Sequence, residues 1–196
     1  MKFWISLGAL IFALPFSAHA IETTLYKSDY AGQEKRIIKS LSEDDIQQLK
    51  NGKGWGLAKA AELNGMPGPT HILQMKSQIG LSDEQEKKIR ALFDSMQSKA
   101  IPLGNQLIEL EKKLNESFAN RTITDGNLIE QLDSISRVRS SLRYVHLATH
   151  LTTPSILNPQ QISDYNRLRG YSSDDPCENM PEGHDEDMWK KHNGCK

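Results

Sequence analysis

The sequence predicts an all-α protein built around one long, kinked αα-hairpin with short flanking helices. Two stretches predict the hairpin arms, because apolar residues recur in both at the helical spacing of three or four. The first stripe comprises Ile89, Phe93, Met96, Ala100, Leu103, Leu107, Leu110, Leu114 and Phe118. The second comprises Leu128, Leu132, Ile135, Val138, Leu142 and Val145. No alternating run of β-branched residues predicts a strand. Because each long arm carries an apolar stripe, we expect the chain to form an intertwined or antiparallel homodimer.

Residues 1–20 predict a cleaved secretory signal peptide. Lys2 supplies a positive charge, an apolar run follows from Phe3 to Ser17, and Ala18-His19-Ala20 is an A-x-A cleavage site. The apolar run is shorter than the roughly 20 residues that a spanning helix needs. We therefore expect a secreted protein without stable membrane insertion.

Residues 21–40 are polar, and we expect them to be loose. Ser42 is the expected cap of a short helix that ends at Asn51-Gly52. Further short helices are expected over residues 57–63 and 70–79, separated by a Pro- and Gly-rich bend. These segments, the hairpin and a last helix make up a helical domain over residues 41–170.

The hairpin arms are expected over residues 82–119 and 125–152. Ser82 and Gln85 form a capping-box pattern at the start of the first arm. Pro102 lies inside this arm and predicts a kink or break near residues 98–104. After the hairpin, Asn158 and Pro159 open a last helix that runs to about Arg169.

Two short motifs resemble a known family. Leu81-Ser82-Asp83-Glu84-Gln85 and Leu157-Asn158-Pro159-Gln160-Gln161 match the pattern L-T-x-x-Q, with Ser82 or Asn158 in place of Thr. Two such motifs around an αα-hairpin, behind a signal peptide, resemble the Spy/CpxP group of periplasmic proteins. That group includes stress chaperones, zinc-resistance-associated proteins and CnrX-type heavy-metal sensors.

A second stretch resembles one branch of the same group. It runs from Gly54-Trp55-Gly56 through Asn64-Gly65 to Pro67-Gly68-Pro69-Thr70-His71. Members of this branch are described as Spy/CpxP-like refolding chaperones or periplasmic metal sensors. The resemblance implies a periplasmic location and leaves both functions open.

The charge balance and the motifs exclude several function classes. The chain has 24 basic and 25 acidic side chains and a formal net charge of −1, which does not favour nucleic-acid binding. No nucleophile elbow, phosphate-binding loop or H-E-x-x-H motif is present. We therefore expect a binding protein, not an enzyme, with no required cofactor.

Four residues are candidate metal ligands. His146 and His150 lie four positions apart on the second arm, and His71 and Met75 repeat that spacing. Such a set suits Zn, Ni, Co or Cu. The alternative is that His146 and His150 are interfacial histidines that hydrogen-bond a backbone group or a carboxylate, and that Met75 fills core space. Glu62 lies near His71 in the sequence and could join such a site, but we expect it to be a solvated helix residue.

The tail, residues 171–196, contains a second set of possible ligands. Cys177 and Cys195 are expected to pair as a disulfide in an oxidising compartment. The alternative is a metal-scavenging tail in which reduced thiols join His184 and His192.

The leading hypothesis is an ATP-independent chaperone-like stress protein that binds unfolded envelope proteins, as the family resemblance implies. Four arginines are candidates for the client surface, and ordinary solubility is the alternative role of each: Arg90, Arg137, Arg139 and Arg143. The other hypothesis is a heavy-metal sensor or resistance protein centred on His146 and His150. A sensor would also need a membrane signalling partner.

Overall fold

The computed structural model describes residues 26, 28–172, 177 and 185–195. The predicted signal peptide, residues 1–20, lies outside this part of the chain. The chain divides into two units, residues 1–32 and 33–196, and every element named here belongs to the second. In order these are η1 (Gln33–Lys35), α1 (Glu43–Lys50), α2 (Lys59–Glu62), α3 (Pro69–Gln74), α4 (Asp83–Ala119), α5 (Asp125–Thr152), η2 (Thr153–Ile156), α6 (Pro159–Leu168) and α7 (Glu186–Asn193). The described residues contain no strand, which confirms the all-α prediction.

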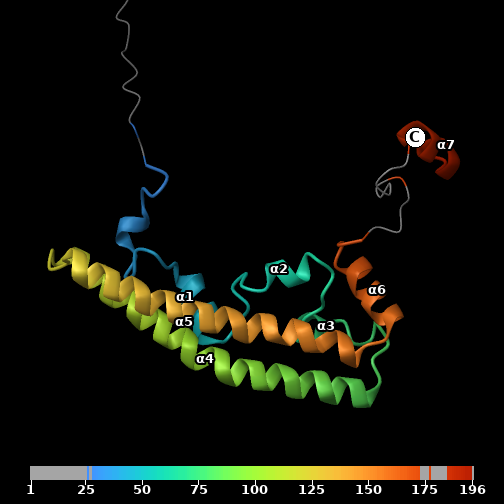
Figure 1. The fold of residues 1–196 in the computed structure, drawn as a ribbon, viewed down its shortest axis with the longest axis horizontal. Coiled ribbons are helices and arrows are strands. Elements are labelled where there is room, and N and C mark those ends of the chain that lie inside the picture. Colours follow the sequence, from blue (N-terminus) through green and yellow to red (C-terminus); the bar gives the residue numbers. More distant parts are fainter. Residues whose placement is uncertain (1–25, 27, 173–176, 178–184, 196) are drawn as a thin grey trace, which may run out of the picture. The chain divides into compact units, whose positions relative to one another are not determined.

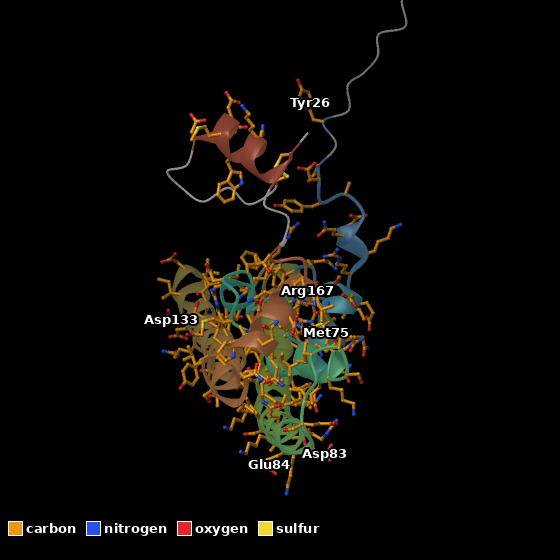
Figure 2. The ribbon with its side chains drawn as sticks, turned by 90° about the vertical axis from the view of Figure 1, so that its right-hand side faces the viewer. Tyr26, Met75, Asp83, Glu84, Asp133 and Arg167 are labelled. Atoms are coloured by element: carbon orange, nitrogen blue, oxygen red, sulfur yellow. A yellow bond between two sulfur atoms is a disulfide. The ribbon has the colours of Figure 1, made fainter. Side chains whose placement is uncertain are left out.

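Helices α4 and α5 form the predicted hairpin and lie side by side (Figure 1). The side chains of Ser82 and Thr124 cap the two helices by accepting hydrogen bonds from backbone N–H groups. Asp83 and Glu84, at the start of α4 in Figure 2, place negative charge at the positive end of the helix dipole. Arg121, with φ of 55°, turns the chain between the helices.

The sequence predicted a kink or break near residues 98–104, and helix α4 has no break there, because it continues through Pro102. A proline at this position removes the donor that would bond the Ser98 carbonyl. Ser98 and Pro102 are both exposed, so water can hydrate that carbonyl and the missing bond is tolerated.

The larger core cluster packs α1 against both arms of the hairpin. Its buried members are Ile38, Leu41, Leu49, Leu57, Ala100, Leu107, Ile108, Ile135, Val138 and Leu142. Gly104 lies against the Leu49 carbonyl, so a Cβ at this position would collide with the α1 backbone. Ile38 is only 2% exposed, so the end of the segment expected to be loose belongs to the core.

The smaller core cluster lies at the open end of the hairpin. It contains Ile72, Ile79, Ile89, Leu157 and Tyr165. The short helices α2 and α3 end earlier than predicted, and residues 75–80 are turns instead of helix.

The predicted stripes are only partly buried. Phe118 is 54% exposed and Leu132 is 44% exposed, whereas Ile108, outside the stripe, is buried. Phe118 lies in the last turn of α4, where there is little left to pack against. Leu132 lies at the edge of the buried face of α5.

Gln85 and Gln161 join the two L-x-x-x-Q motifs through a reciprocal amide pair. The Gln85 Nε2 donates to Gln161 Oε1 at 2.8 Å, and the Gln161 Nε2 donates to Gln85 Oε1 at 2.9 Å. Their second amide hydrogens bond the carbonyls of Ile156 and Gly80, at 2.9 and 3.1 Å. Each amide oxygen also accepts the N–H of its own capping residue, which completes two capping boxes.

The tail contains helix α7, in a segment expected to be loose, and a disulfide between Cys177 and Cys195. The disulfide confirms the predicted pairing. Within the described residues, no helix is both long and apolar enough to cross a membrane.

Replacing Gln161 by Glu should destabilise the fold by about 2–4 kcal/mol near neutral pH. A carboxylate cannot donate, so the Gly80 carbonyl and Gln85 Oε1 would each lose a donor and face a negative charge. Urea denaturation measures the difference. The matched control is Gln106→Glu, at an exposed position of α4, which should change stability by less than about 0.5 kcal/mol. Equal effects of the two substitutions would show that the amide pair has no special role.

Candidate functional site

A groove of about 660 Å³ lies where the two core clusters meet. On α4 its lining lies between Ile89 of the smaller cluster and Ala100 of the larger one. On α5 it follows Leu142, a residue of the larger cluster. The lining includes Trp55, Glu62, Gly68, His71, Phe93, Met96, Gln97, His146, Thr149 and His150. Three of the four candidate metal ligands, His71, His146 and His150, therefore line one groove.

His146 and His150 lie on the buried face of α5, with 3% and 5% exposure. Their spacing of four places both on one side of the helix, as the sequence predicted. The buried face of α5 changes at this point from the aliphatic residues Val138 and Leu142 to polar ones. Burying a polar group without a hydrogen-bond partner costs free energy, so the hydrogen-bond partners of each histidine indicate whether its role is structural.

His150 has a backbone partner. Its Nδ1 lies 2.9 Å from the Met66 carbonyl oxygen, so this nitrogen carries the proton and donates. Gly68 lies directly against the ring, because a Cβ there would be 2.5 Å from Nε2. The bond and the close contact fix the ring, with Nε2 as its remaining nitrogen.

His146 has a buried Nε2 without any hydrogen-bond partner in the described structure. Burial lowers the pKa of this histidine below its usual 6.5, and the neighbouring His150 lowers it further. The imidazole is therefore held neutral, which is the form that binds metals. A buried, neutral and unpartnered nitrogen that lines a cavity is the most unusual feature of the groove.

His71 enters the groove from α3 and is paired with a carboxylate. Its Nδ1 lies 2.7 Å from Oε1 of Glu62, on α2. On its other oxygen, Glu62 is 3.7 Å from the Arg169 guanidinium and 3.5 Å from the Tyr171 hydroxyl. This network fixes the His71 ring with Nε2 as the remaining nitrogen. The sequence placed Glu62 near His71 but favoured a solvated role for it.

The fourth candidate ligand, Met75, does not line the groove. Its side chain packs against the smaller core cluster, in agreement with the alternative of core filling. Met96 lines the groove instead. The distinction could not be seen in the sequence, because both methionines lie at plausible helical positions.

Among the described residues, no three His, Cys, Asp or Glu side chains are already placed to hold one metal ion. The alternative to metal binding was a hydrogen bond to a backbone group or a carboxylate. His150 has such a backbone partner in Met66, and His71 has a carboxylate partner in Glu62. It does not account for His146.

The tail histidines and the four candidate client-binding arginines lie outside the groove or outside the described residues. His184 lies outside the described residues, as does the side chain of His192. Arg90 pairs with Glu86 at 2.7 Å, and Arg139 stacks 4.9 Å from the centroid of the Trp55 ring, so both are engaged within the fold. Arg137 and Arg143 are exposed on α5.

A comparison with protein-family models finds no match to this chain, and comparisons with curated proteins and with solved structures find none either.

Stability should fall as the pH drops below about 6.5, and His146 should cause part of the loss. Because the folded-state pKa of His146 is depressed, the unfolded chain binds a proton that the folded chain does not. Its contribution is therefore present above the ordinary pKa and is lost on acidification. His146→Gln should reduce the difference in unfolding free energy between about pH 7.5 and about pH 5.5. An unchanged difference, measured by urea denaturation, would contradict the assignment.

Proposed function

We propose that this protein binds a transition-metal ion in the groove formed by α3, α4 and α5. The observation that carries the proposal is the buried Nε2 of His146, which has no hydrogen-bond partner in the described structure. Two further histidines line the same groove, each with Nδ1 engaged and Nε2 available. Three imidazoles in one groove that present the same ring nitrogen suit a metal ion better than any other ligand class.

The donor set favours Zn, Ni, Co or Cu. Imidazole nitrogen suits all four, and the thioether of Met96 adds a soft donor that favours copper. Glu62 supports the same interpretation, because metal-bound histidines commonly donate their other ring nitrogen to a carboxylate or a carbonyl. The carbonyl of Met66 has the equivalent role for His150.

Ligation requires His71 and α5 to approach one another, since the three rings are not yet placed around one point. His146 and His150 belong to a 28-residue helix, whereas His71 belongs to a six-residue helix between turns. The shorter element is the one that can move. Metal binding would therefore pull the α2–α3 segment against the hairpin, a change of the kind that a sensor needs.

The cellular role follows from the sequence motifs. The predicted signal peptide, the Cys177–Cys195 disulfide and the resemblance to the Spy/CpxP group support a periplasmic location. In that compartment the protein would act as a heavy-metal sensor or resistance protein.

Zn, Ni or Cu ions should raise the melting temperature by several degrees. At a metal concentration 100 times the Kd, binding stabilises the folded state by about 2.7 kcal/mol. His146→Gln and His150→Gln should each abolish most of this shift. Differential scanning calorimetry in the presence and absence of each metal measures it.

Two controls make this experiment specific. All variants carry His184→Ala and His192→Ala, so that the tail histidines cannot mimic the groove. Phe93→Leu changes a groove residue that has no ligating atom and should keep the shift. An equal shift in every variant, or none in any, would refute the metal site.

Client binding is the second candidate function, and one observation favours it. Large apolar side chains are exposed along the hairpin, with Phe118 at 54%, Tyr144 at 70% and Leu151 at 70%. Exposed apolar surface of this kind marks interaction sites. The sequence favoured this function first, whereas the groove geometry now favours metal binding.

If clients bind there, the protein should suppress aggregation of an unrelated unfolded protein at modest molar excess and without ATP. Light scattering follows the aggregation, with and without metal. Aggregation that proceeds unchanged in both conditions would eliminate client binding.

A further inference from the structure

Glu62 connects the histidine groove to the end of α6. Its Oε1 lies 2.7 Å from Nδ1 of His71, which lines the groove. Its second oxygen, Oε2, lies 3.7 Å from the Arg169 guanidinium and 3.5 Å from the Tyr171 hydroxyl. Arg169 is the C-terminal cap of α6, so one carboxylate on α2 contacts both α3 and the residues that end α6.

Arg169 and Tyr171 also contact each other. The Arg169 guanidinium donates to the Tyr171 hydroxyl at 2.9 Å and lies 5.3 Å from the centroid of the Tyr171 ring. Tyr171 in turn packs edge-on against Tyr165 of the smaller core cluster. We call Arg169 and Tyr171 the clasp. Through its contacts with Glu62, the clasp attaches the end of α6 to α2.

Of the two attachments of Glu62, the one to the clasp is weaker. The bond to His71 is short, whereas the contacts with Arg169 and Tyr171 are near the outer limit for an ion pair or a hydrogen bond. In addition, Nε of Arg169 and Oδ1 of the nearby Asn166 are buried and have no hydrogen-bond partner in the described structure. An arrangement that leaves buried polar atoms unpaired is only marginally favourable, so a better partner for Glu62 can replace the clasp.

A metal ion in the groove supplies such a competitor. When a metal binds Nε2 of His71, the Nδ1 hydrogen becomes more acidic and its bond to Glu62 becomes stronger. The charge of the ion also attracts the carboxylate, in competition with the Arg169 guanidinium. Because His71 must move toward α5 to bind the ion, a carboxylate that follows it lengthens contacts that are already 3.5 and 3.7 Å long.

We propose that Glu62 couples metal binding in the groove to the opening of the clasp, so that the end of α6 is the part of the fold that responds to the metal. This inference rests on the proposed metal site and specifies its regulation. Coupling between two equilibria is reciprocal. The factor by which metal weakens the clasp is therefore the factor by which loss of the clasp tightens metal binding.

Calorimetric titration with zinc chloride measures that factor, on the full chain without its two tail histidines. Arg169→Gln should lower the Kd at least about fivefold, because nothing then competes with His71 for Glu62. Tyr171→Phe removes only the hydroxyl and should give a smaller change in the same direction. The matched control is Arg167→Gln, at an arginine of α6 that pairs with Asp164 at 2.9 Å, which should leave the Kd unchanged. A clasp with only a structural role predicts an equal or weaker affinity in Arg169→Gln, and that result would overturn the coupling.

Amide hydrogen exchange, followed by mass spectrometry, locates the response. Four backbone N–H groups bond carbonyls of the last turn of α6 and so hold its end in place, those of Arg169, Gly170, Tyr171 and Ser172. Saturating zinc should speed their exchange by the factor that the titration gives. In Arg169→Gln, exchange should be equally fast with and without zinc.

The melting temperature of the same samples separates the two proposals. Unchanged or slower exchange in a chain whose melting temperature rises with zinc would overturn the coupling and leave the metal site standing. A melting temperature that does not rise would refute the metal site and the coupling together.

Discussion

The reciprocal amide pair of Gln85 and Gln161 is the interaction on which the arrangement of this fold depends. It is the point where the first residues of α4 meet the first residues of α6, across the open end of the hairpin. All four hydrogen-bonding positions of each amide are used, so the pair is fully satisfied although Gln161 is only 5% exposed. Glutamate would serve equally well in an isolated capping box, but only glutamine can both accept and donate here. This requirement explains why both motifs end in glutamine.

The groove lies between two separate apolar clusters. One cluster packs α1 on the hairpin, and the other packs α3 and α6 at its open end. Between them, α5 presents His146, Thr149 and His150 where aliphatic residues would bury more favourably. Natural sequences depart from a consistent core at functional sites, so a polar interruption at the junction of two clusters is itself evidence of function.

The sequence predicted what depends on local chemistry and missed what depends on distant contacts. The bounds of both hairpin arms followed from capping residues and apolar spacing, and the disulfide followed from the cysteine count. Periodicity does not show which elements pack together. It therefore did not predict that Ile38 is buried, that Leu132 is exposed, or that Met96 and not Met75 lines the groove. The contact between Glu62 and His71 was missed for the same reason, since it forms only when α2 and α3 fold against each other.

Anomalous diffraction from crystals of the full chain grown with Ni or Zn shows whether the histidine groove holds a metal ion. We expect an anomalous peak in the groove, within about 2.0–2.1 Å of Nε2 of His146 and His150 for zinc. In the same crystals, His71 should lie closer to α5, with its Nδ1 still donating to Glu62. A peak only at the tail, or a groove without a peak in crystals that contain the metal, would refute the metal site.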